Sequence, residues 1–111
     1  MQNTRLNKLL TFLAASPDDP FILYALATEY NSLNDTDEAF RYYLKLVAEH
    51  PDYVGTYYHL AKLYLKDGQM ERAIEIYQTG MQRARAKGDG HAFSELQRAY
   101  NAAAGLDYED D

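Results

Sequence analysis

Apolar residues near the start of the chain recur with the spacing of one helix face. At positions i, i+3, i+4 and i+7 stand Leu6, Leu9, Leu10 and Leu13. This period predicts an amphipathic α-helix over residues 2–15. A secretory signal is the less favoured alternative, suggested by Arg5 and Lys8 beside the short apolar stretch. No window approaches the ~18 consecutive apolar residues of a transmembrane helix, so we expect no membrane partner.

Most of the remaining chain repeats itself with a period of 34 residues. Residues 20–53 align without a gap to residues 54–87, and six pairs are identical. The identical pairs are Tyr24/Tyr58, Leu26/Leu60, Ala27/Ala61, Tyr30/Tyr64, Ala39/Ala73 and Tyr43/Tyr77. Their spacing is helical in both halves of the unit, so each unit is predicted to contain two amphipathic helices.

Residues that start and stop helices fall at matching places in the two units. Pro20 suits the first turn of a helix, and Asp18 or Asp19 before it can cap that helix. Asn34 and Gly68 occupy equivalent positions, and both residue types tolerate the left-handed backbone that ends many helices. Candidate caps of the next helix are Asp35, Thr36 and Asp37. A turn is therefore predicted between the two helices of each unit.

Together these positions resemble the tetratricopeptide repeat. In the first unit the family pattern is carried by Leu23, Leu26, Ala27, Tyr30, Asn34, Ala39, Tyr43 and Pro51. In the second unit it is carried by Tyr57, Leu60, Ala61, Tyr64, Gly68, Ala73 and Tyr77. The chain departs from the pattern at Leu46, where a small residue is usual, and at Arg85, where proline is usual. The second departure predicts that the last helix of the second unit continues to about Lys87.

The resemblance implies an all-α fold, a right-handed α-solenoid of helix hairpins with about six helices. The expected parts are a helix at 2–15, full repeats at 20–53 and 54–87, and a capping helix at 90–104. We expect them to form a single domain over residues 1–106, followed by an acidic tail at 107–111. Flanking helices are needed because the ends of a repeat stack otherwise expose apolar surface.

Small and large positions of the pattern have different expected roles. Close approach of paired helices is expected at Ala27, Ala39, Ala61 and Ala73. The wedge between successive hairpins is expected to be filled by Tyr30, Tyr43, Tyr64 and Tyr77. We expect these tyrosines to keep their hydroxyls near water.

In this family the first helix of each repeat lines a concave groove that binds peptides or helices. Alignment with the family would place in that groove Phe21, Tyr24, Thr28, Asn31, Tyr58, His59, Lys62 and Leu65, with Ser94 and Arg98 from the capping helix. The family's carboxylate clamp, which is built from lysine and asparagine, is not expected. Tyr24, Thr28 and His59 stand at the clamp positions instead.

Two features of these groove residues indicate a binding role. Tyr24 and Tyr58 are identical, yet they lie outside the packing pattern of the family. Lys62 and Arg98 add cations to an acidic chain. Such a groove suits a peptide partner with acidic and apolar side chains. The alternative is that the tyrosines cover edges of the core and that the cations are ordinary solvated charges.

Charge and cysteine content exclude other classes of function. The net charge is −6, from 17 acidic and 11 basic side chains, which argues against a general nucleic-acid binder. The chain has no cysteine, which excludes disulfides and thiolate metal sites and fits a cytoplasmic location.

The remaining candidates for chemistry are weak. His50, His59 and His91 do not have the spacing of metal ligands on one helix, and Glu29 and Glu95 are isolated carboxylates at or beside the groove. Residues 88–90 lack the pattern of a phosphate loop. We therefore expect no metal, no cofactor and no enzyme activity.

The sequence thus predicts a protein–protein interaction module that binds a peptide or helix in the groove. The alternative is a self-associating scaffold protein, in which the leucine stripe of residues 6–13 or the last helix completes the stack of another copy. These hypotheses correspond to a monomer and to a weak homo-oligomer, respectively.

Overall fold

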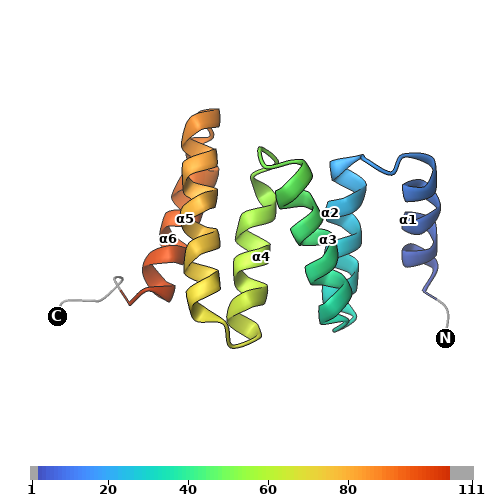
Figure 1. Ribbon diagram of the computed structural model, residues 1–111, viewed down its shortest axis with the longest axis horizontal. Coiled ribbons are helices and arrows are strands. Elements are labelled where there is room, and N and C mark those ends of the chain that lie inside the picture. Colours follow the sequence, from blue (N-terminus) through green and yellow to red (C-terminus); the bar gives the residue numbers. More distant parts are fainter. Residues whose placement is uncertain (1–2, 106–111) are drawn as a thin grey trace. The chain divides into compact units, whose positions relative to one another are not determined.

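The computed structural model describes residues 3–105, and this part of the chain is all-α. Its six helices, shown in Figure 1, are α1 (Thr4–Ala15), α2 (Pro20–Ser32), α3 (Thr36–Glu49), α4 (Gly55–Lys66), α5 (Met70–Lys87) and α6 (Gly90–Ala103). The predicted all-α class and the number of helices are confirmed. The expected acidic tail at residues 107–111 lies outside the described residues. No helix of residues 3–105 is both long and apolar enough to cross a membrane.

Short polar side chains start four of these helices. The Asp19 carboxylate accepts a hydrogen bond from the backbone N–H of Phe21 at 2.9 Å, so Asp19 is the cap of α2. Asp35, the first of three candidates, caps α3 by accepting from the Glu38 N–H at 3.3 Å. Asn3 and Asp89 act in the same way at α1 and α6. Each cap satisfies a backbone donor that has no partner within the helix.

The helix ends follow the predicted turns. Asn34 has φ of 62° and Gly68 has φ of 79°, so both adopt the left-handed backbone expected between the helices of each unit. Helix α5 ends at Lys87, and Gly88 follows it with φ of 77°. The predicted continuation of this helix past Arg85 is therefore confirmed.

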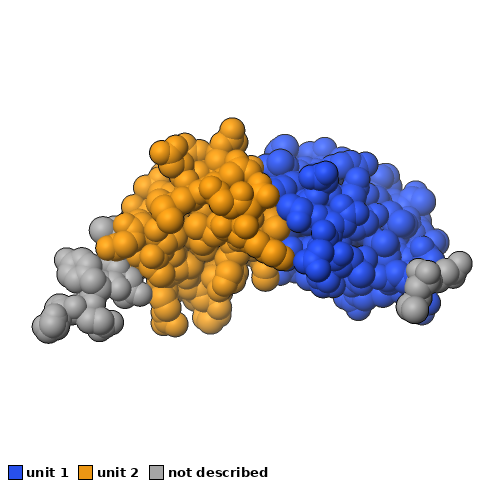
Figure 2. Space-filling view, turned by 90° about the horizontal axis from the view of Figure 1, so that it is seen from below, with its two compact units in different colours: residues 1–50 blue, residues 51–111 orange. Residues whose placement is uncertain are grey.

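The helices group into two compact units, residues 1–50 and residues 51–111, which Figure 2 colours separately. The first unit contains α1, α2 and α3, and the second contains α4, α5 and α6. The expected single domain over residues 1–106 stays a prediction.

In the first unit, α2 and α3 pair along their apolar faces. Both alanines of the repeat pattern, Ala27 and Ala39, are fully buried. So are the large residues of this interface, Leu23, Leu26, Tyr43 and Leu46. Helix α1 packs on α2 through the buried Leu9, and the Glu29 carboxylate of α2 accepts from Asn3 at 3.1 Å and pairs with Arg5 at 2.9 Å.

In the second unit, α5 packs between α4 and α6. Ala61, Ala73 and Leu60 are fully buried, and Leu96 of α6 is 2% exposed. Gly80 of α5 lies against Tyr57 of α4, where an added Cβ would come within 2.6 Å of the Tyr57 Cβ. This contact sets how closely the two helices can approach each other.

The expectation that the pattern tyrosines can keep their hydroxyls near water is wrong for Tyr43. Tyr43 is fully buried and Tyr77 is 1% exposed. The Tyr43 hydroxyl lies 3.3 Å from the Thr28 hydroxyl, which replaces water as its hydrogen-bonding partner. Burial raises the pKa of both tyrosines above its ordinary value, so both remain neutral.

Candidate functional site

The second unit carries an open pocket of about 570 Å³ between α4 and α6, here called the α4–α6 pocket. It is lined by Tyr58, Lys62, Leu65, Tyr77, Glu95, Arg98, Ala99, Ala102 and Ala103. Four of these residues were expected in the groove: Tyr58, Lys62, Leu65 and Arg98. The structure therefore brings together the groove residues that the sequence placed on two separate helices of this unit.

Helical spacing explains why these side chains meet. Tyr58, Lys62 and Leu65 stand at i, i+4 and i+7 of α4, and so they share one face of that helix. On α6 the same spacing relates Glu95, Ala99 and Ala102. Leu60, Ala61 and Tyr64 occupy the other faces of α4 and are buried. Burial of these core residues therefore fixes the orientation of α4 and leaves the face with Tyr58, Lys62 and Leu65 toward the pocket.

Small and aromatic residues give the pocket apolar surface between its cations. Tyr77 of α5 is almost fully buried, and Ala99, Ala102 and Ala103 add only methyl groups. The Lys62 ammonium lies over the Tyr58 ring, 5.6 Å from its centroid. Such a cation–π contact holds the lysine beside the aromatic surface.

His59 is placed differently from the other expected groove residues of this unit. It is half-buried beside the pocket, and its ring meets the Tyr58 ring edge-on with centroids 5.4 Å apart. Burial, followed by the nearby Lys62 ammonium, lowers the pKa of His59, while Glu95 opposes the shift. His59 is therefore neutral at pH 7, and the positive charge of the pocket comes from Lys62 and Arg98.

No role in binding was predicted for Tyr77 or Ala99, and Glu95 was expected only at or beside the groove. The position of Glu95, three residues before Arg98, is the signal that puts it on the same face of α6. Tyr77 could not be found in this way, because the repeat pattern assigns it to packing. It both closes the core and forms part of the pocket wall.

The expected groove residues of the first unit lie on α2. The Tyr24 ring meets the Tyr43 ring edge-on at 6.5 Å, and Tyr24 is half-buried. Thr28 is exposed and uses its hydroxyl to contact Tyr43, while Asn31 is partly exposed one turn further along. Tyr24 and Thr28 therefore also support a core residue, a role that the alternative hypothesis gave to Tyr24 but that was not predicted for Thr28.

Phe21 belongs to a different surface of the first unit. It is 66% exposed and lines a pocket of about 500 Å³ between α1 and α2, here called the α1–α2 pocket. The other lining residues are Thr4, Arg5, Lys8, Leu9, Phe12 and Ala25. Phe21 precedes Tyr24 by three residues, but it points to α1, because α1 packs along this side of α2.

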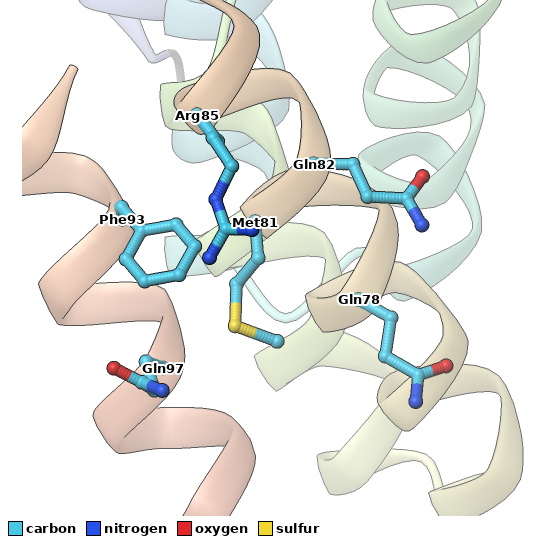
Figure 3. A pocket seen from close by; sticks show the side chains of 6 residues that line it. All are labelled: Gln78, Met81, Gln82, Arg85, Phe93 and Gln97. Atoms are coloured by element: carbon cyan, nitrogen blue, oxygen red, sulfur yellow. The ribbon is translucent and has the colours of Figure 1, made fainter. Parts of the chain in front are cut away.

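Ser94 likewise lies away from the α4–α6 pocket, in a hollow beside the turn between α5 and α6. Another pocket, of about 470 Å³, opens between α5 and α6 and is shown in Figure 3. There the Arg85 side chain reaches from α5 across the Phe93 ring of α6, 4.8 Å from its centroid. Arg85 replaces the usual proline of the pattern, and this departure is the sequence signal for the pocket.

Among residues 3–105, no three histidine, aspartate or glutamate side chains gather as metal ligands would. The carboxylates beside the expected groove are used otherwise. Glu29 is bound by Arg5 and Asn3, and Glu95 lies 3.6 Å from His91. The α4–α6 pocket itself presents two cations, one carboxylate and aromatic walls.

A model of the tetratricopeptide repeat family matches residues 30–100, which include most of both repeat units and most of α6. The chain belongs to the tetratricopeptide repeat family. Members of this family are generally protein-interaction modules and typically have no catalytic activity. The resemblance that the sequence pattern indicated is confirmed.

Solved structures support the same assignment. A solution structure of a tetratricopeptide repeat domain protein from Salinibacter ruber is 42% identical, covers 86% of this chain and 97% of that chain, and has a TM-score of 0.78. A crystal structure under the same description is 44% identical over 80% of this chain and all of that chain, with a TM-score of 0.75.

A protein from Bordetella parapertussis matches the fold alone. It is 23% identical, covers 96% of this chain and 92% of its own, and has a TM-score of 0.79. A search among curated proteins found no match.

Proposed function

We propose that this tetratricopeptide repeat protein binds a protein partner through the α4–α6 pocket, and that the bound segment is a peptide with acidic and apolar side chains. The observation that carries the proposal is the position of Lys62 over the Tyr58 ring, with Arg98 in the lining of the same open pocket. The whole chain has a net charge of −6, so this pocket concentrates cations on a protein that is otherwise acidic.

Some pocket residues would contribute apolar contact area to binding, and others would contribute charge. Tyr58 and Leu65 offer apolar surface to the partner, and a few buried anchors of this kind contribute most of the affinity in typical interfaces. Lys62 and Arg98 are exposed, so each ion pair with a partner would add ~0.2–1 kcal/mol and would weaken with salt. The charges therefore select an acidic partner more than they tighten its binding.

We further propose Tyr24, Thr28 and Asn31 as a separate binding surface of the first unit. They share one face of α2, and they leave aromatic and polar surface partly exposed there. Tyr24 and Thr28 both contact the buried Tyr43, and side chains held in this way lose less conformational entropy on binding.

A peptide array tests the proposed chemistry. Ten-residue peptides that mix Asp or Glu with Leu, Tyr or Phe are printed beside matched peptides in which Lys replaces each acid. The wild-type protein is expected to bind the acidic set selectively, and the dissociation constant of the best peptide is then measured. The double variant Lys62→Glu, Arg98→Glu should bind that peptide at least tenfold more weakly, which corresponds to ~1.4 kcal/mol.

The matched control is Arg41→Glu combined with Arg72→Glu, at two exposed arginines that are outside the pocket lining. It changes charge in the same direction and should leave the dissociation constant nearly unchanged. An equal loss in the control would mean that net charge, and not the pocket, governs binding. Selective binding of the lysine peptides would contradict the proposal outright.

A second candidate function is self-association, and one observation favours it. Phe12 and Phe21 are 53% and 66% exposed around the α1–α2 pocket, and such apolar surface is a common site of association. Sedimentation equilibrium at several concentrations measures it. The scaffold hypothesis requires a dimer that Phe12→Ser with Phe21→Ser dissociates, whereas a monomer at all concentrations would rule it out.

A further inference from the structure

The segment that follows the last helix has the chemistry that the α4–α6 pocket is proposed to bind. Residues 106–111 read Leu-Asp-Tyr-Glu-Asp-Asp, which combines four carboxylates with the apolar surfaces of Leu106 and Tyr108. We propose that this segment docks in the α4–α6 pocket of its own chain and competes there with a partner peptide. The inference rests on the proposed function, because the same pocket is the binding site in both.

The segment is close enough to reach the pocket. The pocket lining includes Arg98, Ala99, Ala102 and Ala103, so it extends to the last residue of α6. At 1.5 Å per residue, the helix rises only about 7.5 Å from Arg98 to Ala103. Six residues in an extended conformation span roughly 20 Å. Gly105, with φ of 75°, takes the left-handed conformation that turns a chain off the axis of the helix it leaves.

The order of residues in the segment matches the order of surfaces in the pocket. Its helix-end side is formed by Ala102, Ala103 and Leu65, which lie in the last turns of α6 and α4. Backbone carbonyls make the C-terminal ends of helices negative, so this side disfavours a carboxylate and suits Leu106. The carboxylates come later in the segment, where it would pass Arg98 and Lys62.

Glu95 is the one acidic residue of the pocket lining, and its position limits the repulsion. It lies eight residues before Ala103, about two turns of α6 away from the entry point of the segment. His91, one turn before Glu95 on α6, lies 3.6 Å from its carboxylate, whereas Arg98 stands about one turn after it. A docked segment can therefore place its carboxylates at Lys62 and Arg98 before it reaches Glu95.

Attachment to the same chain makes even a weak contact effective. A short tether gives an effective concentration on the order of 1 mM, so a segment with a dissociation constant of ~0.1 mM would weaken a competing ligand about tenfold. Partners that bind the pocket tightly would displace the segment, whereas acidic peptides of lower affinity would not.

The test measures competition in the full chain. The probe is a fluorescein-labelled peptide with the sequence of residues 105–111, and its dissociation constant is measured by fluorescence polarisation. The tail variant carries Asp107→Asn, Glu109→Gln, Asp110→Asn and Asp111→Asn. A control variant loses four exposed acids elsewhere through Asp18→Asn, Asp37→Asn, Glu71→Gln and Glu75→Gln. Both variants change the net charge equally, so they separate competition from general electrostatics.

The probe is expected to bind the tail variant about tenfold more tightly than it binds the wild type or the control variant. Adding Lys62→Glu and Arg98→Glu to the tail variant should abolish that binding. Equal dissociation constants for the wild type and the tail variant would overturn the proposal. It would also be overturned if sedimentation showed a wild-type dimer that the tail variant lacks, because the segment would then dock on a second copy.

The array peptides keep this result separate from the proposed function. If binding of the array peptides depends on Lys62 and Arg98, but the tail variant and the wild type bind the probe equally, then the pocket binds partners and the inference about the segment is wrong. If the array peptides do not depend on these two residues, the proposed function itself is wrong, and the inference falls with it.

Discussion

At the scale of single residues, the two repeats fill equivalent space with different pairs of side chains. Leu46 departs from the family pattern, which has a small residue there, and its counterpart 34 residues later is Gly80. The size difference is reversed at another pair of equivalent positions, where the first unit has Leu23 and the second has the larger Tyr57. All of these large side chains are fully buried. A leucine pair in one hairpin thus takes the place of a tyrosine and a glycine in the other.

This exchange predicts a large effect of adding one methyl group at Gly80. In Gly80→Ala the new Cβ would lie 2.6 Å from the Tyr57 Cβ, which cannot retreat without moving the backbone of α4. Overpacking of this kind costs ~1–3 kcal/mol, against a gain of at most ~1 kcal/mol in helix propensity. Urea denaturation should show a lower free energy of unfolding.

Gly90→Ala is the control, since a Cβ there meets nothing within 4 Å. It should leave the free energy of unfolding unchanged or slightly higher. If both variants were equally stable, the close packing of Gly80 on Tyr57 would be wrong.

His59 links the stability of the second unit to pH. Because burial and Lys62 lower its pKa in the folded chain, the unfolded chain binds more protons at pH values between that lowered pKa and about 6.5. The stability that His59 contributes is therefore fully present above about pH 6.5, and it is lost as the pH falls toward the lowered pKa.

Replacing His59 with glutamine should remove this pH dependence. The free energy of unfolding would be measured in urea at pH 7.5, 6.5 and 5.5 for both proteins. The wild type should lose more stability than His59→Gln between pH 7.5 and 5.5. Parallel pH profiles would show that His59 is not perturbed by its surroundings.

At the scale of helices and turns, the start of α2 shows what the structure adds to the sequence. Asp18 and Asp19 were equal candidates for its cap, because either precedes Pro20. Only the geometry distinguishes them: Asp19 accepts the Phe21 N–H, while Asp18 is exposed in the turn before it. A difference of one residue in position therefore decides which carboxylate accepts the hydrogen bond from the first turn of α2.

Asp19→Ala should therefore destabilise the protein by ~1 kcal/mol, the usual loss for a helix cap. Asp18→Ala removes the same charge from the neighbouring position and should change stability by less than ~0.5 kcal/mol. Thermal unfolding followed by circular dichroism compares the two. A larger loss for Asp18→Ala would reverse the assignment of the cap.

The elements were more predictable than the site. Helices, turns and the long α5 follow from local signals, namely the 34-residue period, the left-handed Asn34 and Gly68, and the missing proline at Arg85. The surroundings of Phe21 and Ser94 were not predictable, since they depend on the neighbouring helix and not on spacing within their own. The burial of the Tyr43 hydroxyl depends in the same way on Thr28 from another helix.

At the scale of the whole molecule, the charge of the α4–α6 pocket is opposite in sign to the net charge of the chain. The chain carries six more acidic than basic side chains, yet the α4–α6 pocket holds two cations and one carboxylate. Like-charge repulsion from the acidic surface disfavours contact with most acidic proteins. An acidic partner would therefore need a segment that reaches the pocket, which favours short peptides over large flat surfaces.

The most direct test of this account locates a bound peptide by nuclear magnetic resonance. The best acidic peptide from the array is titrated into ¹⁵N-labelled protein, and changes in the amide signals are followed to saturation. The account predicts that the largest changes fall on Tyr58, Lys62, Leu65 and Arg98. Changes that centre instead on Phe12 and Phe21, or on Arg85 and Phe93, would contradict it.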